Sequence, residues 1–321
     1  MNNEPIIIVG GEPNSVFLEI FFKSIKKINY ISPIIIIVSK KLLVQQMIKL
    51  GFNYKINLID QNYKDFSKLN NKKINLINVN YNFKKPFEKI SLKSNNYINN
   101  CFEISLEILK KNKLTKLING PISKKHFLKG KNLGITEYLA KKTKRENKVI
   151  MLIFNKKLSV SPITTHLPLK DVYKNISKQK IYTHINLITE FYKKNFKKNP
   201  KIAVTGLNPH CESNFQNSEE DVTIIPAIKN LKVKNFKVKG PFPADTIFMQ
   251  ENLKKFDVII GMYHDQVLTP MKTLFGFDAI NITLGLPFIR VSPDHGPNSS
   301  MLGKNLSNPK SLIEALKFLD K

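Results

Sequence analysis

The chain has 321 residues, which is enough for two domains of ordinary size. Hydrophobic residues make up 42% and charged residues 24%, a balance that supports a packed core and excludes disorder. No apolar run approaches the roughly 20 residues of a membrane-spanning helix, and the N-terminus lacks the basic start and apolar stretch of a signal peptide. Two cysteines are too few for a disulfide framework. The composition predicts a globular cytoplasmic protein that does not contact a membrane.

The formal net charge of +28 would suit a nucleic-acid-binding protein. The lysines are scattered along the chain, however, so a biased composition on a solvated surface explains the charge better, and we expect no nucleic-acid partner. A positive field still favours encounters with phosphorylated ligands. Arg145 and Arg290 are the only arginines. In a chain that otherwise uses lysine, Arg290 points to planar, bidentate recognition of a carboxylate or phosphate.

Strand and helix patterns alternate along the first half of the chain. Apolar runs predict strands over residues 5–9, 33–39, 74–79 and 114–118. Periodic apolar positions predict helices over residues 16–25, 41–50 and 95–111. The rest of residues 61–94 is rich in Asn and Lys, and we expect irregular loops there.

The second half continues the same rhythm. Strands are expected over residues 149–154, 158–163, 201–205, 236–238, 258–260 and 279–283, and helices over 178–196, 220–231 and 310–319. Such alternation predicts an α/β fold with mostly parallel sheets. No linker rich in Pro or Ser separates two halves, so a second domain is expected as an insertion within the first.

Three histidines follow apolar strands, each expected to lie just past the strand's carboxyl end and to be followed by a loop. They are His166, His210 and His264. Ligands of open α/β sheets bind at this edge, and three imidazoles with an open position can hold a catalytic metal ion. Their spacing matches no local metal motif, so hydrogen bonding within each loop is an equal alternative. We expect His184 to be structural or on the surface and His126 to be solvated.

Polar side chains stand among apolar runs between residues 240 and 296. Asp245 lies in a loop that prolines constrain, and Lys272, Asn281 and Arg290 follow it. Together they would suit a small anionic substrate held near a metal ion. The sequence has no Gly-x-Gly-x-x-Gly, Walker A or Gly-x-Ser-x-Gly motif. Cys211 could act as a nucleophile, but a single cysteine without such a context more often fills space.

Several longer motifs occur in a fixed order: Thr164–Asp171, Gly206–His210, Gly240–Phe248, Met262–Gln266, Asn281–Arg290 and Ser292–Gly296. With them the chain closely resembles the 4-hydroxythreonine-4-phosphate dehydrogenase family of pyridoxal phosphate (vitamin B6) biosynthesis. The resemblance extends from Gly11 to the last helix.

The resemblance implies a fold similar to isocitrate and isopropylmalate dehydrogenases, in which two α/β domains flank a cleft. Residues 1–125 and 273–321 would form the first domain from both termini. Residues 126–272 would form the second, with the metal histidines and dimer contacts. The protein is expected to be a homodimer whose active sites draw on both subunits.

The same resemblance implies a set of site residues. The metal ligands would be His166, His210 and His264, holding one divalent ion (zinc, magnesium or cobalt). Substrate would be bound by Thr136, Lys272, Asn281 and Arg290, with Asp245 or Lys272 as the base. NAD or NADP would contact His295 and Asn308. The implied reaction oxidises 4-hydroxythreonine 4-phosphate at C3 and then releases CO2.

Four departures from the family pattern bear on this expectation. Ile135 replaces a substrate-contacting histidine, Val267 replaces a glycine, and residues 211–215 and 297–300 differ from the usual loops. One alternative is therefore a dehydrogenase of the same family for a phosphorylated sugar acid, such as threonate or erythronate 4-phosphate. A weakened metabolite binder and a non-catalytic nucleic-acid-binding protein are further alternatives.

Overall fold

The computed structural model describes residues 4–128, 134–211, 217–276, 278–293 and 295–320. The chain separates into two compact units, of which unit 1 is Met1–Leu139 with Pro287–Lys321 and unit 2 is Ala140–Leu286. Both ends of the chain thus belong to unit 1, and unit 2 is an insertion in it. The sequence placed the divisions after residues 125 and 272. That the units are two domains flanking a cleft stays a prediction.

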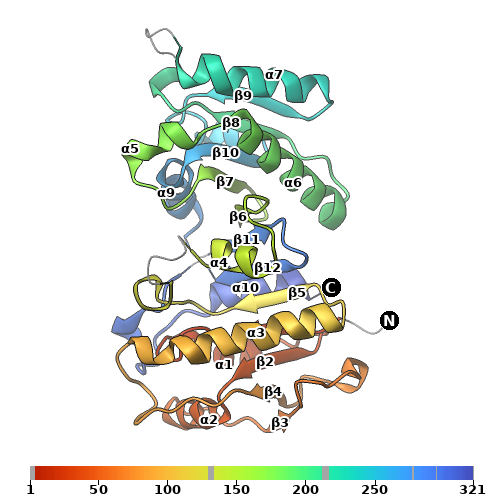
Figure 1. Cartoon of the computed structure of the whole chain (residues 1–321), viewed down its shortest axis with the longest axis vertical. Helices are drawn as coiled ribbons and strands as arrows, with labels where there is room; N and C mark the ends of the chain where they lie inside the picture. Colours follow the sequence, from red (N-terminus) through yellow and green to blue (C-terminus); the bar gives the residue numbers. More distant parts are fainter. Residues whose placement is uncertain (1–3, 129–133, 212–216, 277, 294, 321) are drawn as a thin grey trace. The chain divides into compact units, whose positions relative to one another are not determined.

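Unit 1 contains a parallel sheet in the order β3-β4-β2-β1-β5-β12 (Figure 1). Its strands are β1 (Ile6–Val9), β2 (Ile34–Val38), β3 (Ile56–Leu58), β4 (Ile74–Asn78), β5 (Lys116–Asn119) and β12 (Ile289–Pro293). The central strands β1 and β2 are buried along their whole length, because helices cover both faces. This explains why their sequences are continuous apolar runs rather than alternating ones.

The helices of unit 1 lie on the two faces of its sheet (Figure 1). One face carries α1 (Phe17–Lys27), α2 (Lys40–Lys49) and α10 (Lys310–Leu319), and the other carries α3 (Asn95–Lys111). The helix α4 (Ile135–Lys142) begins in unit 1 at the position of the expected substrate contacts. Its Tyr138 packs on Phe102 of α3 and donates a hydrogen bond to Asn99 over 2.8 Å, so α3 fixes the start of α4.

Unit 2 contains a mixed sheet in the order β11-β6-β7-β10-β8-β9. Its strands are β6 (Ile150–Phe154), β7 (Ser159–Thr164), β8 (Ile202–Thr205), β9 (Val238–Phe242), β10 (Val258–Tyr263) and β11 (Ile280–Leu284). The four strands β7, β10, β8 and β9 are parallel, whereas β6 is antiparallel to both of its neighbours. The predicted α/β class with mostly parallel sheets is therefore confirmed.

Helices also cover the sheet of unit 2. They are α5 (Leu169–Val172), α6 (Lys178–Phe196), α7 (Ile225–Val233), α8 (Gln250–Leu253) and α9 (His264–Phe275). The long α6 packs on β6, β7 and α7, while α9 packs on β7 and β10. In the part of the chain that the structure describes, no helix is long and apolar enough to cross a membrane.

The predicted elements match the structure wherever a long periodic pattern exists. The helices α3, α6 and α10 have the predicted bounds. The helices α4, α5, α8 and α9 and the strands β3 and β12 were not predicted, and the loop expected after His264 is instead the helix α9. The helix α9 was missed because Pro270 lies inside it, where proline is unfavourable, and β12 because it ends in a proline.

We predict that the β1 core dominates the stability of unit 1. Ile8 is fully buried, so Ile8→Ala should lower the free energy of unfolding by about 2–5 kcal/mol. Ile31 is 75% exposed, and Ile31→Ala should change it by no more than about 0.5 kcal/mol. Urea unfolding followed by circular dichroism measures both, and equal effects of the two substitutions would contradict the packing described here.

Candidate functional site

The three predicted histidines follow adjacent parallel strands of unit 2 at one edge of the sheet. His166 comes two residues after β7, His264 directly after β10, and His210 five residues after β8. Since β10 lies between β7 and β8, His264 belongs to the central strand of the three (Figure 1). The expected placement of the histidines past the carboxyl ends of strands is confirmed, while their role as ligands stays a prediction.

Two of these imidazoles lie close together. The ring centroids of His166 and His264 are 5.7 Å apart, and both side chains are half-buried. Nδ1 of His264 is 2.6 Å from a carboxylate oxygen of Asp265. Because a carboxylate only accepts hydrogen bonds, Nδ1 is the donor in this contact, and Nε2 is the ring nitrogen left to face a ligand.

His210 differs from the other two histidines in its exposure and its backbone conformation. It is exposed, and its φ of 58° places it in the left-handed region within the turn Pro209–Cys211. Among the residues that the structure describes, no group of three His, Cys, Asp or Glu side chains is arranged to hold a metal ion. The structure thus brings two of the three histidines together and leaves the third on the neighbouring strand end. The altered loop at 211–215 lies outside the described residues after Cys211.

A buried carboxylate that the sequence analysis missed fixes the loop leading to His210. Glu220 accepts hydrogen bonds from the backbone N–H groups of Leu207 (2.7 Å) and Asn208 (2.9 Å) and from the Asn208 side chain (2.8 Å). Burial opposes ionisation of Glu220, yet the hydrogen bonds from Asn208 and Leu207 outweigh it and leave its pKa below the usual range. Nothing in the local sequence marks Glu220, because its partners are more than ten residues away.

Asp245 lies at the same edge of the sheet as the histidines. It is exposed in a turn three residues after β9, which is parallel to β8. The expected loop around Asp245 is therefore present, at the strand ends where ligands of α/β sheets bind.

Lys272 and Asn281 lie away from this edge. Lys272 is eight residues along α9 from His264, a rise of about 12 Å. Asn281 is in register with Ile153 of β6, which is in register with Val160 of β7. Val160 is four residues, about 13 Å, before the end of β7. Within unit 2, the predicted substrate residues and the histidines are thus not brought together.

The Asn281 side chain has an unusual environment. Its Nδ2 donates to the sulfur of Met151 over 3.4 Å, and its Oδ1 is buried without a hydrogen-bond partner among the described residues. A buried amide oxygen without a donor costs about 1–3 kcal/mol. A bound ligand that donates a hydrogen bond would recover this cost.

Arg290 is a buried residue of β12 rather than the polar end of an apolar run. It is 1% exposed, and its Nε donates a 2.6 Å hydrogen bond to Asn119 at the end of β5. Burial lowers the pKa of Arg290 to about 9, and the negative charge of Glu137 opposes this shift. Glu137 follows Thr136 in the first turn of α4, so the guanidinium, α4 and β5 form one cluster in unit 1.

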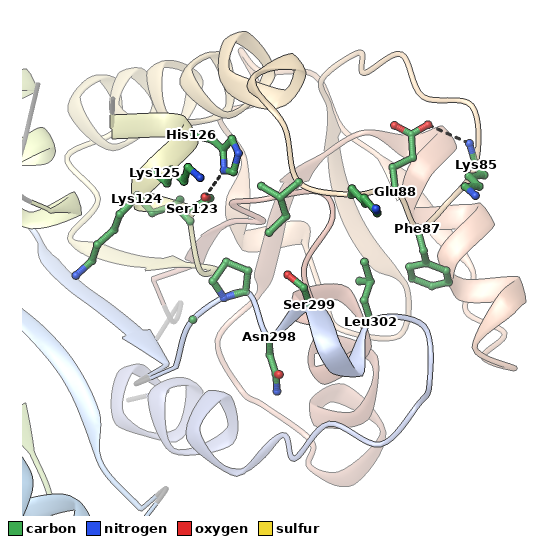
Figure 2. Close-up of a pocket in the computed structure, with 15 residues that line it drawn as sticks. Lys85, Phe87, Glu88, Ser123, Lys124, Lys125, His126, Asn298, Ser299 and Leu302 are labelled. Carbon is green, nitrogen blue, oxygen red and sulfur yellow. Dashed lines mark hydrogen bonds between the residues drawn. The ribbon is translucent and has the colours of Figure 1, made fainter. Parts of the chain in front are cut away.

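A pocket of about 870 Å³ lies in unit 1 (Figure 2). Three segments line it, namely residues 85–90, 122–126 and 296–302, and its charged side chains are Lys85, Glu88, Lys89, Lys124 and Lys125. His126 also lines it, half-buried and 2.8 Å from the hydroxyl of Ser123, so the expectation of a solvated histidine is wrong. No sequence motif spans the pocket, because its three segments are far apart in the chain.

The two residues expected to contact the cofactor differ in position. His295 directly precedes the pocket residue Gly296, and its Nε2 is buried without a hydrogen-bond partner among the described residues. Asn308 does not line the pocket, and its Oδ1 accepts a 2.9 Å hydrogen bond from the Lys310 N–H at the start of α10. His295 is thus a sequence neighbour of the pocket lining, whereas Asn308 bonds the backbone of the residue that begins α10.

Comparisons with known proteins agree with this architecture. A family model described as pyridoxal phosphate biosynthetic protein PdxA matches residues 29–319. A 4-hydroxythreonine-4-phosphate dehydrogenase of Sulfurihydrogenibium sp. is 36% identical over 98% of this chain and 96% of its own. A putative D-threonate 4-phosphate dehydrogenase of Oceanobacillus iheyensis is 37% identical over 72% of this chain and 70% of its own.

Solved structures give the same result. A putative 4-hydroxythreonine-4-phosphate dehydrogenase from Salmonella typhimurium has a TM-score of 0.84 at 27% identity, over 99% of this chain and 98% of that one. The fold and these relatives define the class of the protein as an α/β dehydrogenase, an oxidoreductase. The chain belongs to the pyridoxal phosphate biosynthetic protein PdxA family. The resemblance stated from the sequence motifs is confirmed.

His184 is a core residue of α6 and not part of this site. It is 6% exposed, and its Nδ1 is 3.0 Å from the hydroxyl of Ser161. Burial, with a contribution from the positive charge of Lys180, lowers its pKa to about 3. The unfolded chain binds a proton at this imidazole near pH 6.5 and the folded chain does not, so stability falls as the pH drops below about 6.5.

We predict that His184 alone destabilises the protein by about 2 kcal/mol between pH 7.5 and pH 5, at 1.36 kcal/mol per pH unit below 6.5. Urea unfolding of His184→Gln at both pH values should show a smaller loss on acidification than wild type. The control Thr189→Val, also buried in α6, should keep the wild-type pH dependence. Equal acid sensitivity of His184→Gln and wild type would refute the role of this imidazole.

Proposed function

We propose that the protein oxidises 4-hydroxythreonine 4-phosphate at C3 with NAD or NADP, followed by loss of the carboxylate as CO2, in pyridoxal phosphate biosynthesis. The observation that carries this proposal is the 36% identity, over nearly the whole of both chains, to a protein named 4-hydroxythreonine-4-phosphate dehydrogenase. The relatives described above are named dehydrogenases, so we do not propose a nucleic-acid-binding function.

The substrate is held by Arg290, Lys272, Asn281 and Thr136, with the two cationic side chains toward its anionic groups. The guanidinium of Arg290 loses hydration through burial, and a bound carboxylate or phosphate would offset that loss with charge-assisted hydrogen bonds. The buried Oδ1 of Asn281 suits a hydroxyl or ammonium donor of the substrate. Thr136 is half-buried at the start of α4, next to Glu137, whose charge acts on Arg290.

A divalent metal ion would use the imidazoles at the strand ends, of which the structure brings two together. The imidazoles of His166 and His264 have the separation of two ligands that share one ion, and His210 would be the third ligand. Imidazole suits zinc and cobalt, with magnesium a less favourable candidate because it prefers oxygen ligands. When bound, the ion would lower the pKa of the substrate hydroxyl and orient it.

Two side chains of this protein are candidates for the base that accepts the proton of that hydroxyl. Asp245 follows β9 at the edge that carries the histidines, and so it can act on the same substrate within one subunit. Lys272 lies about 12 Å along α9 from His264, so it could act there only from another chain. The position of the strands favours Asp245 as the base.

The protein works as a homodimer with shared active sites. The histidines and Asp245 are at one edge of the sheet of unit 2, whereas Lys272 and Asn281 lie toward the other edge. A second copy that places its substrate-binding residues against the histidines of the first would complete the site. This arrangement supports the dimer that the sequence resemblance implies.

NAD or NADP occupies the pocket of unit 1. The pocket's four lysines favour the phosphate groups of a dinucleotide over a neutral ligand (Figure 2). His295 directly precedes the pocket residue Gly296. Its Nε2 has no hydrogen-bond partner among the described residues and can bond an adenine or ribose group. Asn308 would affect cofactor binding only indirectly, by fixing the start of α10.

A second candidate substrate is a phosphorylated sugar acid. One relative of similar identity is named as a putative D-threonate 4-phosphate dehydrogenase, and Ile135 replaces the imidazole expected for the amino acid substrate. The half-buried Ile135 is the first residue of α4, next to Thr136, so it adjoins the proposed substrate contacts.

We predict that NADH or NADPH forms with 4-hydroxythreonine 4-phosphate and that Ile135→His lowers KM with little change in kcat, because an added imidazole contact strengthens ground-state binding. Absorbance at 340 nm measures this for the amino acid and for D-threonate and D-erythronate 4-phosphates. Faster turnover of a sugar-acid phosphate by wild type, impaired by Ile135→His, would replace the first candidate with the second.

A further prediction concerns the metal. His264→Ala should lose the bound divalent ion and the activity but keep its thermal unfolding temperature, because an open site at strand ends does not stabilise the fold. His126→Ala, a histidine of unit 1, should bind metal as wild type does. Titration calorimetry with Zn²⁺ checks both variants, and wild-type affinity in His264→Ala would exclude this site.

A further inference from the structure

The loop after β1, residues 10–16, bonds to two of the three segments that surround the pocket of unit 1. The Glu12 N–H donates to the carbonyl of Pro121 over 2.9 Å, directly before the second lining segment. The Val16 N–H donates to the carbonyl of Pro297 over 3.2 Å, within the third. The strand β1 has β2 on one side and β5 on the other, and ligands of open α/β sheets bind in the crevice beside such a strand. The loop therefore lies where the segments of the pocket meet.

Two buried amide side chains attach the remaining lining segment, residues 85–90, to this loop. Oδ1 of Asn14 accepts a 2.9 Å hydrogen bond from the Glu88 N–H. Nε2 of Gln46, a residue of α2, donates to the carbonyl of Pro86 over 2.7 Å. The same Nε2 donates over 3.0 Å to the carbonyl of the loop residue that precedes Asn14. One amide of the loop and one of α2 thus bond to the backbone of the segment.

The surroundings of these two amides show that their polar contacts matter. Gln46 is fully buried, and its Oε1 has no hydrogen-bond partner among the described residues. A leucine would avoid that unfavourable burial, so the two bonds from Nε2 are what favour glutamine here. Asn14 is 2% exposed, and its side chain also bonds Tyr81. Residues 85–90 belong to no helix or strand, so these bonds from outside the segment strongly determine its position.

The segment brings positive charge to the pocket. It contains two of the four lysines that line the pocket, Lys85 and Lys89, and one carboxylate, Glu88. An oxygen of Glu88 accepts hydrogen bonds from the backbone N–H groups of Lys84 (2.6 Å) and Lys85 (3.3 Å), as Figure 2 shows for Lys85. These bonds use the carboxylate within its own segment. The two lysines leave the segment with a net positive charge, which favours a phosphate group as its ligand.

We propose that Asn14 and Gln46 are positioning residues that hold residues 85–90 at the pocket, and so set its affinity for the phosphate groups of NAD or NADP. This inference rests on the cofactor pocket of the proposed function. Neither amide lines the pocket, and each acts through the backbone of the segment. When the segment is no longer held, its two lysines no longer contribute their full share to cofactor binding.

The first test replaces Asn14 with alanine, which removes the acceptor of the Glu88 N–H. Asn14→Ala should weaken NADH binding by about 10-fold, the equivalent of one lost charge-assisted hydrogen bond to a phosphate. Titration calorimetry measures this affinity. Without any cofactor, the backbone of residues 85–90 should also exchange hydrogen for deuterium faster than in wild type.

The matched control is Asn75→Ala, which removes an amide of the same type and the same 2% exposure. Nδ2 of Asn75 donates to two backbone carbonyls, over 3.1 and 3.0 Å, near the amino end of β4 and so at the edge of the sheet away from the pocket. Asn75→Ala should lower the unfolding temperature but keep the NADH affinity of wild type and the exchange rate of residues 85–90. An equal loss of affinity in both variants would overturn the proposal.

The second test combines Gln46→Leu with a lysine variant that carries Lys85→Gln and Lys89→Gln. Gln46→Leu keeps the size of the side chain and removes both bonds from Nε2, so it tests the inference even if Asn14→Ala fails to fold. Gln46→Leu and the lysine variant should each weaken NADH binding. Adding Gln46→Leu to the lysine variant should cause little further loss, because the amide acts through these lysines. Fully additive losses would contradict that mechanism.

A variant that fills the pocket separates this inference from the proposed function. Ser299 lines the pocket, and Ser299→Trp places an indole in it. If Ser299→Trp binds NADH as wild type does, the cofactor lies elsewhere, and both the cofactor pocket and the positioning role are overturned. If Ser299→Trp loses affinity but Asn14→Ala and Gln46→Leu keep it, the pocket stands and the positioning role is overturned, whatever the exchange rates. Loss of affinity in Ser299→Trp, Asn14→Ala and Gln46→Leu, with Asn75→Ala unaffected, supports the proposal.

Discussion

Parallel hydrogen bonding of β7, β10 and β8 is the constraint on which the candidate site depends. Parallel strands end at the same edge of a sheet, so the imidazoles of His166 and His264, which are far apart in the chain, become neighbours there, and His210 lies after the adjoining strand β8. Antiparallel pairing of any one of these strands would move its histidine to the other edge. The imidazole pair of His166 and His264 and the turn that carries His210 both follow from this pairing.

The same sheet also separates the proposed site residues of unit 2 from one another. The helix α9 begins with His264 at the carboxyl edge and carries Lys272 toward the amino edge, where the chain turns into β11 and Asn281. The segment from α9 to β11 thus contains one proposed metal ligand and two proposed substrate ligands, and most of the length of the strands separates the first from the other two. A rigid helix cannot bring its two ends together, and this physical separation favours a site completed by a second copy.

Local patterns explain how much the sequence alone could predict. The bounds of α3 and α6 and the strand ends before the three histidines followed from apolar periodicity and runs, which depend on neighbouring residues only. The hydrogen bond from Thr205 to Gln266, the carboxylate of Glu220 and the lysine-lined pocket join segments that are far apart in the chain, so no local pattern marks them. His264 was placed correctly at a strand end, but the helix that it begins was missed. Pro270 interrupts the helical sequence pattern, although the folded chain accommodates it inside α9.

Burial gives a physical reason why position 290 has an arginine in a chain that otherwise uses lysine. Burial lowers the pKa of Arg290 to about 9, which still leaves a full positive charge at neutral pH. A lysine begins from a lower ordinary pKa than an arginine, so the same burial would bring it closer to losing its charge at neutral pH. The guanidinium can also bond Asn119 through Nε while its terminal nitrogens point to another group in the same plane, which an ammonium cannot do. A buried guanidinium that stays charged at neutral pH suits the carboxylate or phosphate proposed as its ligand, which gives a physical reason for arginine at this position.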